Sequence, residues 1–256
     1  MSSAAFLATH RLSYQPHGQP RPIVDAVSLQ LRAGERVALI GSSGSGKSTL
    51  LKLILALQSA TDGEVRCQQH QVRPASVRAL RWYRQQVQYI AQDPATTLDP
   101  RRTVADVLAE PQRQLKGLQP DQLQLAAILT QVRLDASLLT QRCASLSGGQ
   151  AQRVAIARAI ALQPRFLLAD EPVSGLDLPL RQQINHLLAD IARQQQMGLL
   201  VVSHDLSSIT CLCERVLVMD NGAIVEDAPV RQLLCHPQHP ASQRLLDAIP
   251  RLPLAN

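Results

Sequence analysis

Nine residues, Gly41 to Thr49, have the composition of a loop that binds phosphate. They read GSSGSGKST and stand between two apolar runs, VALI and LLKLILAL. In the pattern GxxxxGK[ST], the glycines let successive N–H groups and a helix N-terminus point at an anion. The lysine adds a positive charge at the outer phosphates, and the next hydroxyl can ligate Mg²⁺. The residues predicted to bind nucleotide are Gly41, Ser42, Ser43, Gly44, Ser45, Gly46, Lys47, Ser48 and Thr49.

An acidic pair follows the apolar run FLLA and supplies a second kind of chemistry. Asp170 ends this predicted buried strand, where its carboxylate can hold Mg²⁺ directly or through water. Glu171 is next, and adjacent side chains at a strand end point in different directions, so it is free to polarise an attacking water. A positioned base of this kind contributes about 10²- to 10⁴-fold in rate. The alternative interpretation is a solvated acidic pair on the surface.

A third motif, LSGGQ, lies directly before the strongly helical stretch AQRVAIARAIAL. It presents a serine hydroxyl and glycine amides at a helix N-terminus, which is a second end able to bind phosphate. The candidate residues here are Ser147, Gly148, Gly149 and Gln150.

Together with Gln92, the run DEP, the segment SGLD and a histidine after the strand LLVVS, these motifs resemble the nucleotide-binding subunit of ABC transporters. The resemblance covers nearly the whole chain, with six motifs in the family's order. It implies an ATPase that uses ATP and Mg²⁺. Gln92 then contacts Mg²⁺ or water, His204 reaches the γ-phosphate, and Asp177 communicates across a dimer. Tyr14 resembles the aromatic that stacks on adenine, worth about 1–3 kcal/mol, although an ordinary strand tyrosine is the alternative.

The resemblance also implies partners. In the family, the signature loop of one subunit closes the ATP bound to another, so we expect a second homologous ABC ATPase subunit in a sandwich dimer. No apolar run reaches the roughly 18–20 residues that span a bilayer. We therefore expect two separate membrane permease subunits, an indirect solute-binding protein, and a location on the cytoplasmic face of the inner membrane.

Finer signals point to one branch of the family. The segments QDPATTLDPRRTV, VSGLD and HPQHPASQRLLDAIP resemble the subgroup that powers dipeptide, oligopeptide and nickel uptake. Asp99, Gly175 and Ala241-Ser242 depart from its usual residues. Overall similarity favours nickel or metal-chelate import by the smaller of two non-identical ATPases, with peptide import as the alternative. A soluble non-transport ABC ATPase would need tandem cassettes or a coiled-coil insert, and a P-loop kinase would leave LSGGQ unexplained.

The elements that must position these residues follow from periodicity. FLATHRLSY and VDAVSLQLR indicate alternating strands, ERVALIG, QVQYIAQ, RFLLAD and GLLVVSH indicate further strands, and RVLVMD and AIVED indicate a hairpin around Asn221-Gly222. The 123 positions from Lys47 to Asp170 exceed one strand-helix-strand unit, which indicates an insertion broken at Pro111, Gly117 and Pro120.

The predicted class is α/β, a P-loop NTPase core of the ABC type with an antiparallel β subdomain and an inserted helical subdomain. One domain spans 1–256: the core is 1–92 and 163–235, the helical signature subdomain is 93–162, and the C-terminal tail is 236–256.

Composition sets the remaining limits. The 256 residues are 45% hydrophobic, enough for a proper core. The net charge is +6 with scattered arginines, so no nucleic acid partner is expected. The start lacks a charged region followed by an apolar one, as expected for a cytoplasmic chain. Five cysteines without a CxxC spacing fit reduced thiols, and the apolar surroundings of Cys211 and Cys213 favour core over metal binding.

Overall fold

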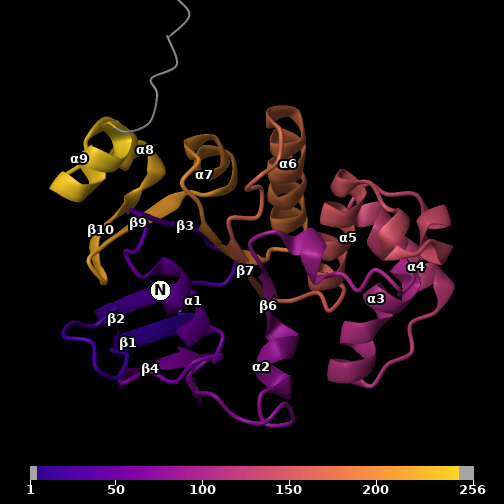
Figure 1. Cartoon of the computed structure of the whole chain (residues 1–256), viewed down its shortest axis with the longest axis horizontal. Helices are drawn as coiled ribbons and strands as arrows, with labels where there is room; N and C mark the ends of the chain where they lie inside the picture. The colour runs from indigo at the N-terminus through magenta and orange to yellow at the C-terminus, as the bar shows by residue number, and fades with distance from the viewer. Residues whose placement is uncertain (1–4, 248–256) are drawn as a thin grey trace, which may run out of the picture.

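The computed structural model describes residues 5–247 of the chain. Two sheets and their covering helices make up this part, and one group of helices is set to one side, at the right of Figure 1. Among residues 5–247, no helix is long and apolar enough to cross a membrane. The arrangement confirms the predicted α/β class, with an antiparallel sheet beside a mainly parallel one.

A six-stranded sheet carries most of the candidate residues at its strand ends. Its order is β10-β9-β3-β8-β7-β6, and all neighbours are parallel except β9 and β10. That pair forms the predicted hairpin, in which Asn221 and Gly222 both have positive φ, as a tight two-residue turn requires. The strands are β3 Arg36–Gly41, β6 Val87–Ile90, β7 Phe166–Asp170, β8 Gly198–Val202, β9 Arg215–Asp220 and β10 Ala223–Pro229.

The sheet separates two hydrophobic cores. Side chains alternate across a strand, so Val37 and Leu39 of β3 face one core while Ala38 and Ile40 face the other. The first core lies between this sheet, the antiparallel sheet and α1 (Lys47–Ile54). The second lies under α5 (Gly148–Ile160), α6 (Leu178–Gln194) and α7 (Leu206–Leu212). Burial on both faces explains why β3, β7 and β8 are nearly continuous apolar runs.

The antiparallel sheet has the order β2-β1-β4-β5. Exposed and buried residues alternate along much of β2, as in a sheet with one face in water. β1 is irregular near Arg11, whose φ is 45°, and its register with both neighbours shifts there. The strands are β1 Leu7–Tyr14, β2 Val24–Leu31, β4 Asp62–Cys67 and β5 His70–Val72.

Six helices of the described chain lie outside the segment between β6 and β7. Figure 1 places α1 beside the antiparallel sheet, α6 and α7 at the opposite side of the large sheet, and α8 and α9 by the hairpin. They are α1 Lys47–Ile54, α2 Arg81–Gln86, α6 Leu178–Gln194, α7 Leu206–Leu212, α8 Val230–Cys235 and α9 Pro240–Asp247.

Helices also dominate the segment between β6 and β7. α3 (Val104–Pro111) continues past Pro111 as a π turn and stops at Gly117, whose φ is 70°. Pro120 lies in the loop before α4 (Gln122–Gln131). Thus, of the predicted breaks, Pro111 does not interrupt the helical path. The remaining elements are α5 Gly148–Ile160 and the short 3-10 turns Pro94–Thr97, Ala136–Thr140 and Cys143–Ser145.

The end of the described chain is attached to β10 through one carboxylate. Glu226 accepts hydrogen bonds from the backbone N–H groups of Gln238 and His239, each at 3.0 Å, and from the hydroxyl of Ser242. Ala241 and Ser242, which depart from the subgroup's tail, are both buried here. The last residues of the predicted tail, 248–256, lie outside the described part.

Candidate nucleotide site

The predicted phosphate loop joins β3 to α1. Gly46 caps α1 in the left-handed conformation, with φ of 106°. A Cβ atom at Gly46 would overlap the carbonyl oxygen of Ile23, and one at Gly41 would overlap that of Met219, so both positions require glycine. α1 has no acidic residue in its first turn. The positive end of its dipole is therefore left for an external anion.

Lys47 is held inside the curve of this loop. Its Nζ donates to the carbonyl oxygens of Gly41 and Ser42, at 2.9 and 2.8 Å, and lies 3.3 Å from the hydroxyl of Ser45. Burial lowers the pKa of Lys47, against the opposing charges of Glu171 and Asp170. The ammonium group thus connects the phosphate loop electrostatically to the acidic pair.

Asp170 ends β7 and meets the phosphate loop. Only 8% of it is exposed. Its carboxylate is hydrogen-bonded by the hydroxyl of Ser48, and Oδ2 lies 3.5 Å from the hydroxyl of Tyr89. Burial raises the pKa of Asp170, and the charge of Glu171 adds to the rise, whereas the hydrogen bonds from Ser48 and Tyr89 oppose it.

The donors around Asp170 fit Mg²⁺. This ion prefers oxygen ligands and is usually held by one or two carboxylates together with substrate phosphates. The Ser48–Asp170 contact places a hydroxyl and a carboxylate together beside the loop. Within residues 5–247, no group of three or more His, Cys, Asp or Glu could hold a metal by itself. A hydroxyl and a carboxylate are a small oxygen set of the kind that substrate phosphates and water complete around Mg²⁺.

Glu171 and His204 follow the neighbouring strands β7 and β8, and their side chains meet. The Nδ1 atom of His204 lies 2.9 Å from Oε1 of Glu171. An ionised carboxylate only accepts, so Nδ1 carries the proton in this pair. Glu171 has φ of 46°, a left-handed conformation that costs about 1–3 kcal/mol, and its N–H donates to Val202. The side chain of His204 is 74% exposed and that of Glu171 22%, so water reaches the pair.

The LSGGQ motif forms the start of α5. Ser147 is the N-cap, and its hydroxyl accepts the N–H of Gln150 while the side chain of Gln150 accepts the N–H of Ser147. This capping box fixes the loop's shape. Gly148 and Gly149 are the first two residues of the helix. α5 and α1 lie in different parts of the molecule, on opposite sides of β6 in Figure 1.

Three further candidates lie around the main cluster. Tyr14 ends β1 and packs partly against the first core. Gln92 is exposed, two positions beyond the end of β6. Asp177 is the N-cap of α6, and its carboxylate accepts the N–H of Leu180 at 2.9 Å. The structure therefore gives Asp177 a local capping contact, while the roles expected for all three at a dimer or nucleotide stay predictions.

Sequence reasoning did not find two connections to the site, of which the first is buried. The amide of Gln152, on α5, donates to the carbonyl oxygen of Pro172, directly after Glu171. This bond joins α5 to the segment that follows the acidic pair. The signal in the sequence is a glutamine at a position of AQRVAIARA that helical periodicity turns toward the core, where an amide needs a partner.

The second connection is centred on Arg181 of α6. Its guanidinium donates to the carbonyl oxygen of Leu176 at 3.2 Å and lies 3.5 Å from Asp205, the residue after His204. Ser208 donates to the same Asp205 carboxylate and accepts from Asn185. The network thus ties the SGLD segment to the loop of His204. No local pattern could have indicated it, because its members come from different elements.

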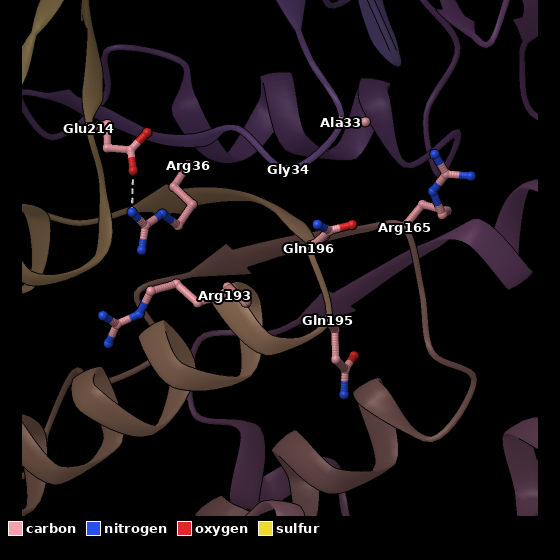
Figure 2. A pocket seen from close by; sticks show the side chains of 9 residues that line it. Ala33, Gly34, Arg36, Arg165, Arg193, Gln195, Gln196 and Glu214 are labelled. Carbon is pink, nitrogen blue, oxygen red and sulfur yellow. Dashed lines mark hydrogen bonds and ion pairs between the residues drawn. The ribbon is translucent and has the colours of Figure 1, made fainter.

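A polar pocket of about 590 Å³ lies at the opposite ends of the strands of the large sheet, away from the candidate residues (Figure 2). Arg36 begins β3, and Arg165 and Glu214 immediately precede β7 and β9, so the pocket is at the amino ends of these strands. Arg36 and Glu214 form an ion pair across it. In parallel α/β sheets, ligands bind at the carboxyl ends of the strands, where the candidate residues lie.

Comparison with known proteins identifies relatives over most of the chain. The profile of a family described as "ABC transporter" matches residues 24–174. A Brucella ovis protein named "Putative peptide import ATP-binding protein" is 39% identical over 246 residues, covering 95% of this chain and 77% of that protein. The nickel import ATP-binding protein NikE of Shigella boydii is 41% identical over 214 residues, covering 83% and 80%.

Solved structures show the same fold. A dimeric ATP-binding cassette in a post-hydrolysis state, bound to ADP and Pi, superposes with a TM-score of 0.76 at 27% identity, covering 88% of this chain and 99% of the other. The cbiO1 protein of Clostridium perfringens superposes with a TM-score of 0.79 at 21% identity, covering 91% and 92%.

Proposed function

The chain belongs to the ABC transporter family, and we propose that it is the subunit that hydrolyses ATP to energise a bacterial importer of the peptide and nickel class. The main support for this chemistry is the contact between Ser48 and Asp170, which lies beside the Glu171–His204 pair. The proposal is supported by a glycine-rich loop, oxygen donors that could hold a metal and a carboxylate that could act as a base, all at the same ends of the parallel strands.

Different residues of the chain bind the phosphates, hold the metal and accept the proton. The loop amides and Lys47 bind the outer phosphates, and Ser48 and Asp170 would hold Mg²⁺, with Gln92 proposed as a further ligand. Bound there, Mg²⁺ supplies charge neutralisation at the phosphate oxygens. Glu171 accepts the proton of the attacking water, and His204 fixes the orientation of its carboxylate through the 2.9 Å contact.

A second ATPase subunit completes the site. Ser147 caps α5, which lies apart from α1 in the same chain, so its outward face is available to a nucleotide on another subunit. The dimeric cassette at 27% identity supports this arrangement. We propose a heterodimer in which each LSGGQ loop covers the ATP on the partner's phosphate loop, and in which Asp177 lies near the dimer axis.

A groove between the core and the inserted helices is the proposed contact for the permeases. It has a volume of about 410 Å³ and is lined by the end of α1, α2, β6, α3 and the π turn. Leu57 and Val77 on its wall are 61% and 63% exposed, and such exposed apolar side chains mark partner surfaces. Docking there would hold the chain at the inner face of the membrane.

We propose only the chemical class of the transported cargo. Nickel or a metal chelate is the first candidate and a short peptide the alternative, and the named relatives, 41% identical over 214 residues for nickel and 39% over 246 for peptide, support them about equally. We expect a gene for a solute-binding protein beside this one, and calorimetry on its product, with nickel chelates and with short peptides, would decide between them. Binding of neither would contradict the proposed class.

Reconstitution tests the ATPase assignment. The chain alone should hydrolyse ATP slowly, and turnover should rise steeply when the partner ATPase and the neighbouring permeases are added. A Leu57→Glu variant should lose co-purification with the permeases, whereas Leu123→Glu, a change at an exposed leucine of α4 outside the groove, should not. Full activity in a preparation shown by sizing to be monomeric would contradict the composite site.

A further inference from the structure

We propose that Tyr89 is a positioning residue for the metal-binding carboxylate of Asp170. The inference rests on the proposed assignment of Asp170 as a Mg²⁺ ligand and adds a residue that none of the recognised motifs contains. Tyr89 lies on β6, three positions before Gln92, and its hydroxyl is 3.5 Å from Oδ2 of Asp170.

The sheet explains how the tyrosine reaches this carboxylate. β6 and β7 are parallel neighbours, and Tyr89 pairs with Leu168, two positions before Asp170. The phenol is long enough to extend along the strand direction to the end of β7. Its ring packs partly against the first core, beside α1. A tyrosine hydroxyl carries its proton at neutral pH, so it donates the hydrogen bond to the carboxylate.

A donor at Oδ2 has a defined consequence for metal binding. The carboxylate of Asp170 already accepts a bond from Ser48, and the contact from Tyr89 fixes one more direction around it. Partners of this kind orient a ligand toward its metal, and their removal typically costs about 10- to 100-fold in metal affinity. If the contact served only to satisfy the phenol hydroxyl, its removal would leave metal binding unchanged.

Tyr89 also lines the groove proposed for the permeases, and Tyr83 lines the same groove. The hydroxyl of Tyr83 donates to the carbonyl oxygen of Ile54 at 2.7 Å and is fully buried. Tyr83→Phe therefore removes a phenol hydroxyl from the same groove without touching Asp170. It is the matched control for Tyr89→Phe, which keeps the ring and removes only the contact to the carboxylate.

The test uses Mn²⁺ as the probe and a non-hydrolysable ATP analogue on the full chain. Free Mn²⁺ is followed by electron paramagnetic resonance, and analogue binding without metal is followed by calorimetry in EDTA. Tyr89→Phe should weaken Mn²⁺ binding about 10-fold and leave binding without metal unchanged. Tyr83→Phe should bind Mn²⁺ as the wild type does, although its melting temperature falls because the Ile54 carbonyl loses its buried partner.

Any other outcome contradicts either the positioning role of Tyr89 or the assignment of Asp170 as a metal ligand. If Asp170→Asn weakens Mn²⁺ binding and Tyr89→Phe does not, the positioning role is wrong and the metal assignment stands. If Asp170→Asn also binds Mn²⁺ normally, the metal assignment itself is wrong. Equal losses in Tyr89→Phe and Tyr83→Phe, or a loss that also appears in EDTA, would show a general structural effect and overturn the positioning role.

Discussion

The Nδ1 atom of His204 lies 2.9 Å from the Oε1 atom of Glu171, although 33 positions separate the two residues in the chain. They meet because β7 and β8 are adjacent and parallel, so both strands end at the same edge of the sheet. The contact fixes the direction of the proposed base and the tautomer of the histidine.

Glu171→Gln should bind ATP and fail to hydrolyse it. The amide keeps the size of the side chain but cannot take a proton from water, so turnover should fall about 10²- to 10⁴-fold. ATP-bound dimers should accumulate. Radiolabelled ATP retention, sizing and turnover of the assembled complex measure this, with Glu214→Gln at the opposite edge of the sheet as control. Near-normal turnover in Glu171→Gln would contradict the role of Glu171 as the base.

Asp170→Asn should stabilise the protein without nucleotide while weakening Mg²⁺-dependent ATP binding. Burial and Glu171 raise the pKa of Asp170 in the folded state, so its ionised form costs stability at neutral pH. Removing the charge should add about 0.5–2 kcal/mol to the free energy of unfolding. The gain should shrink as the pH falls through the raised pKa, because Asp170 is then protonated. Denaturant melts between pH 4 and 8 test the sign, and a lower stability at pH 7 would contradict it.

Lys47→Ala should weaken ATP binding by about 10- to 100-fold, since a hydrogen bond to a charged group is worth about 1.5–3 kcal/mol. The side chain also holds the loop through Gly41 and Ser42, so the loop's amides should exchange hydrogen faster. Lys52→Ala is the control, an exposed lysine in the last turn of the same helix. Wild-type ATP affinity in Lys47→Ala would exclude the phosphate-loop assignment.

Arg181→Ala should slow turnover more than it weakens ATP binding. The guanidinium joins Leu176 to Asp205, so its loss should let the SGLD segment and the loop of His204 move independently. Arg193→Ala, on the same helix and paired at the surface with Asp190, should leave turnover unchanged. A turnover defect of equal size in both variants would assign the effect to α6 as a whole.

Glu226→Gln should loosen α9 at neutral pH. Burial opposes ionisation, but the bonds from Ser242 and from the amides of Gln238 and His239 lower the pKa of Glu226 below its usual value. In the wild type this contribution is present above the ordinary glutamate pKa and is lost as the pH falls through the lower folded value. Hydrogen exchange of α9 should therefore rise in the wild type only under acid conditions, and in the variant at pH 7. Protection unchanged in the variant would contradict this.

The parts that the sequence predicts are those decided by local pattern. The buried runs of β3, β7 and β8, the loop from Gly41 to Thr49 and the Asn221-Gly222 turn each carry their signal within a few residues. β4 and β5 carry none, because DGEVRC and HQV are too polar and too short to stand out. The contacts of Tyr89 and Arg181 depend on which elements become neighbours in the fold, and no local sequence pattern indicates these neighbours.

The capping box of Ser147 has a consequence for how two subunits meet. Ser147 and Gln150 bind each other within one chain, so the loop loses its conformational entropy during folding rather than during association. The serine hydroxyl accepts from the backbone and keeps its own proton to donate outward. In the proposed dimer, a nucleotide carried by the second subunit would therefore encounter a preorganised donor. We expect the two cassettes to dock as rigid bodies, at a rate set by diffusion and charge.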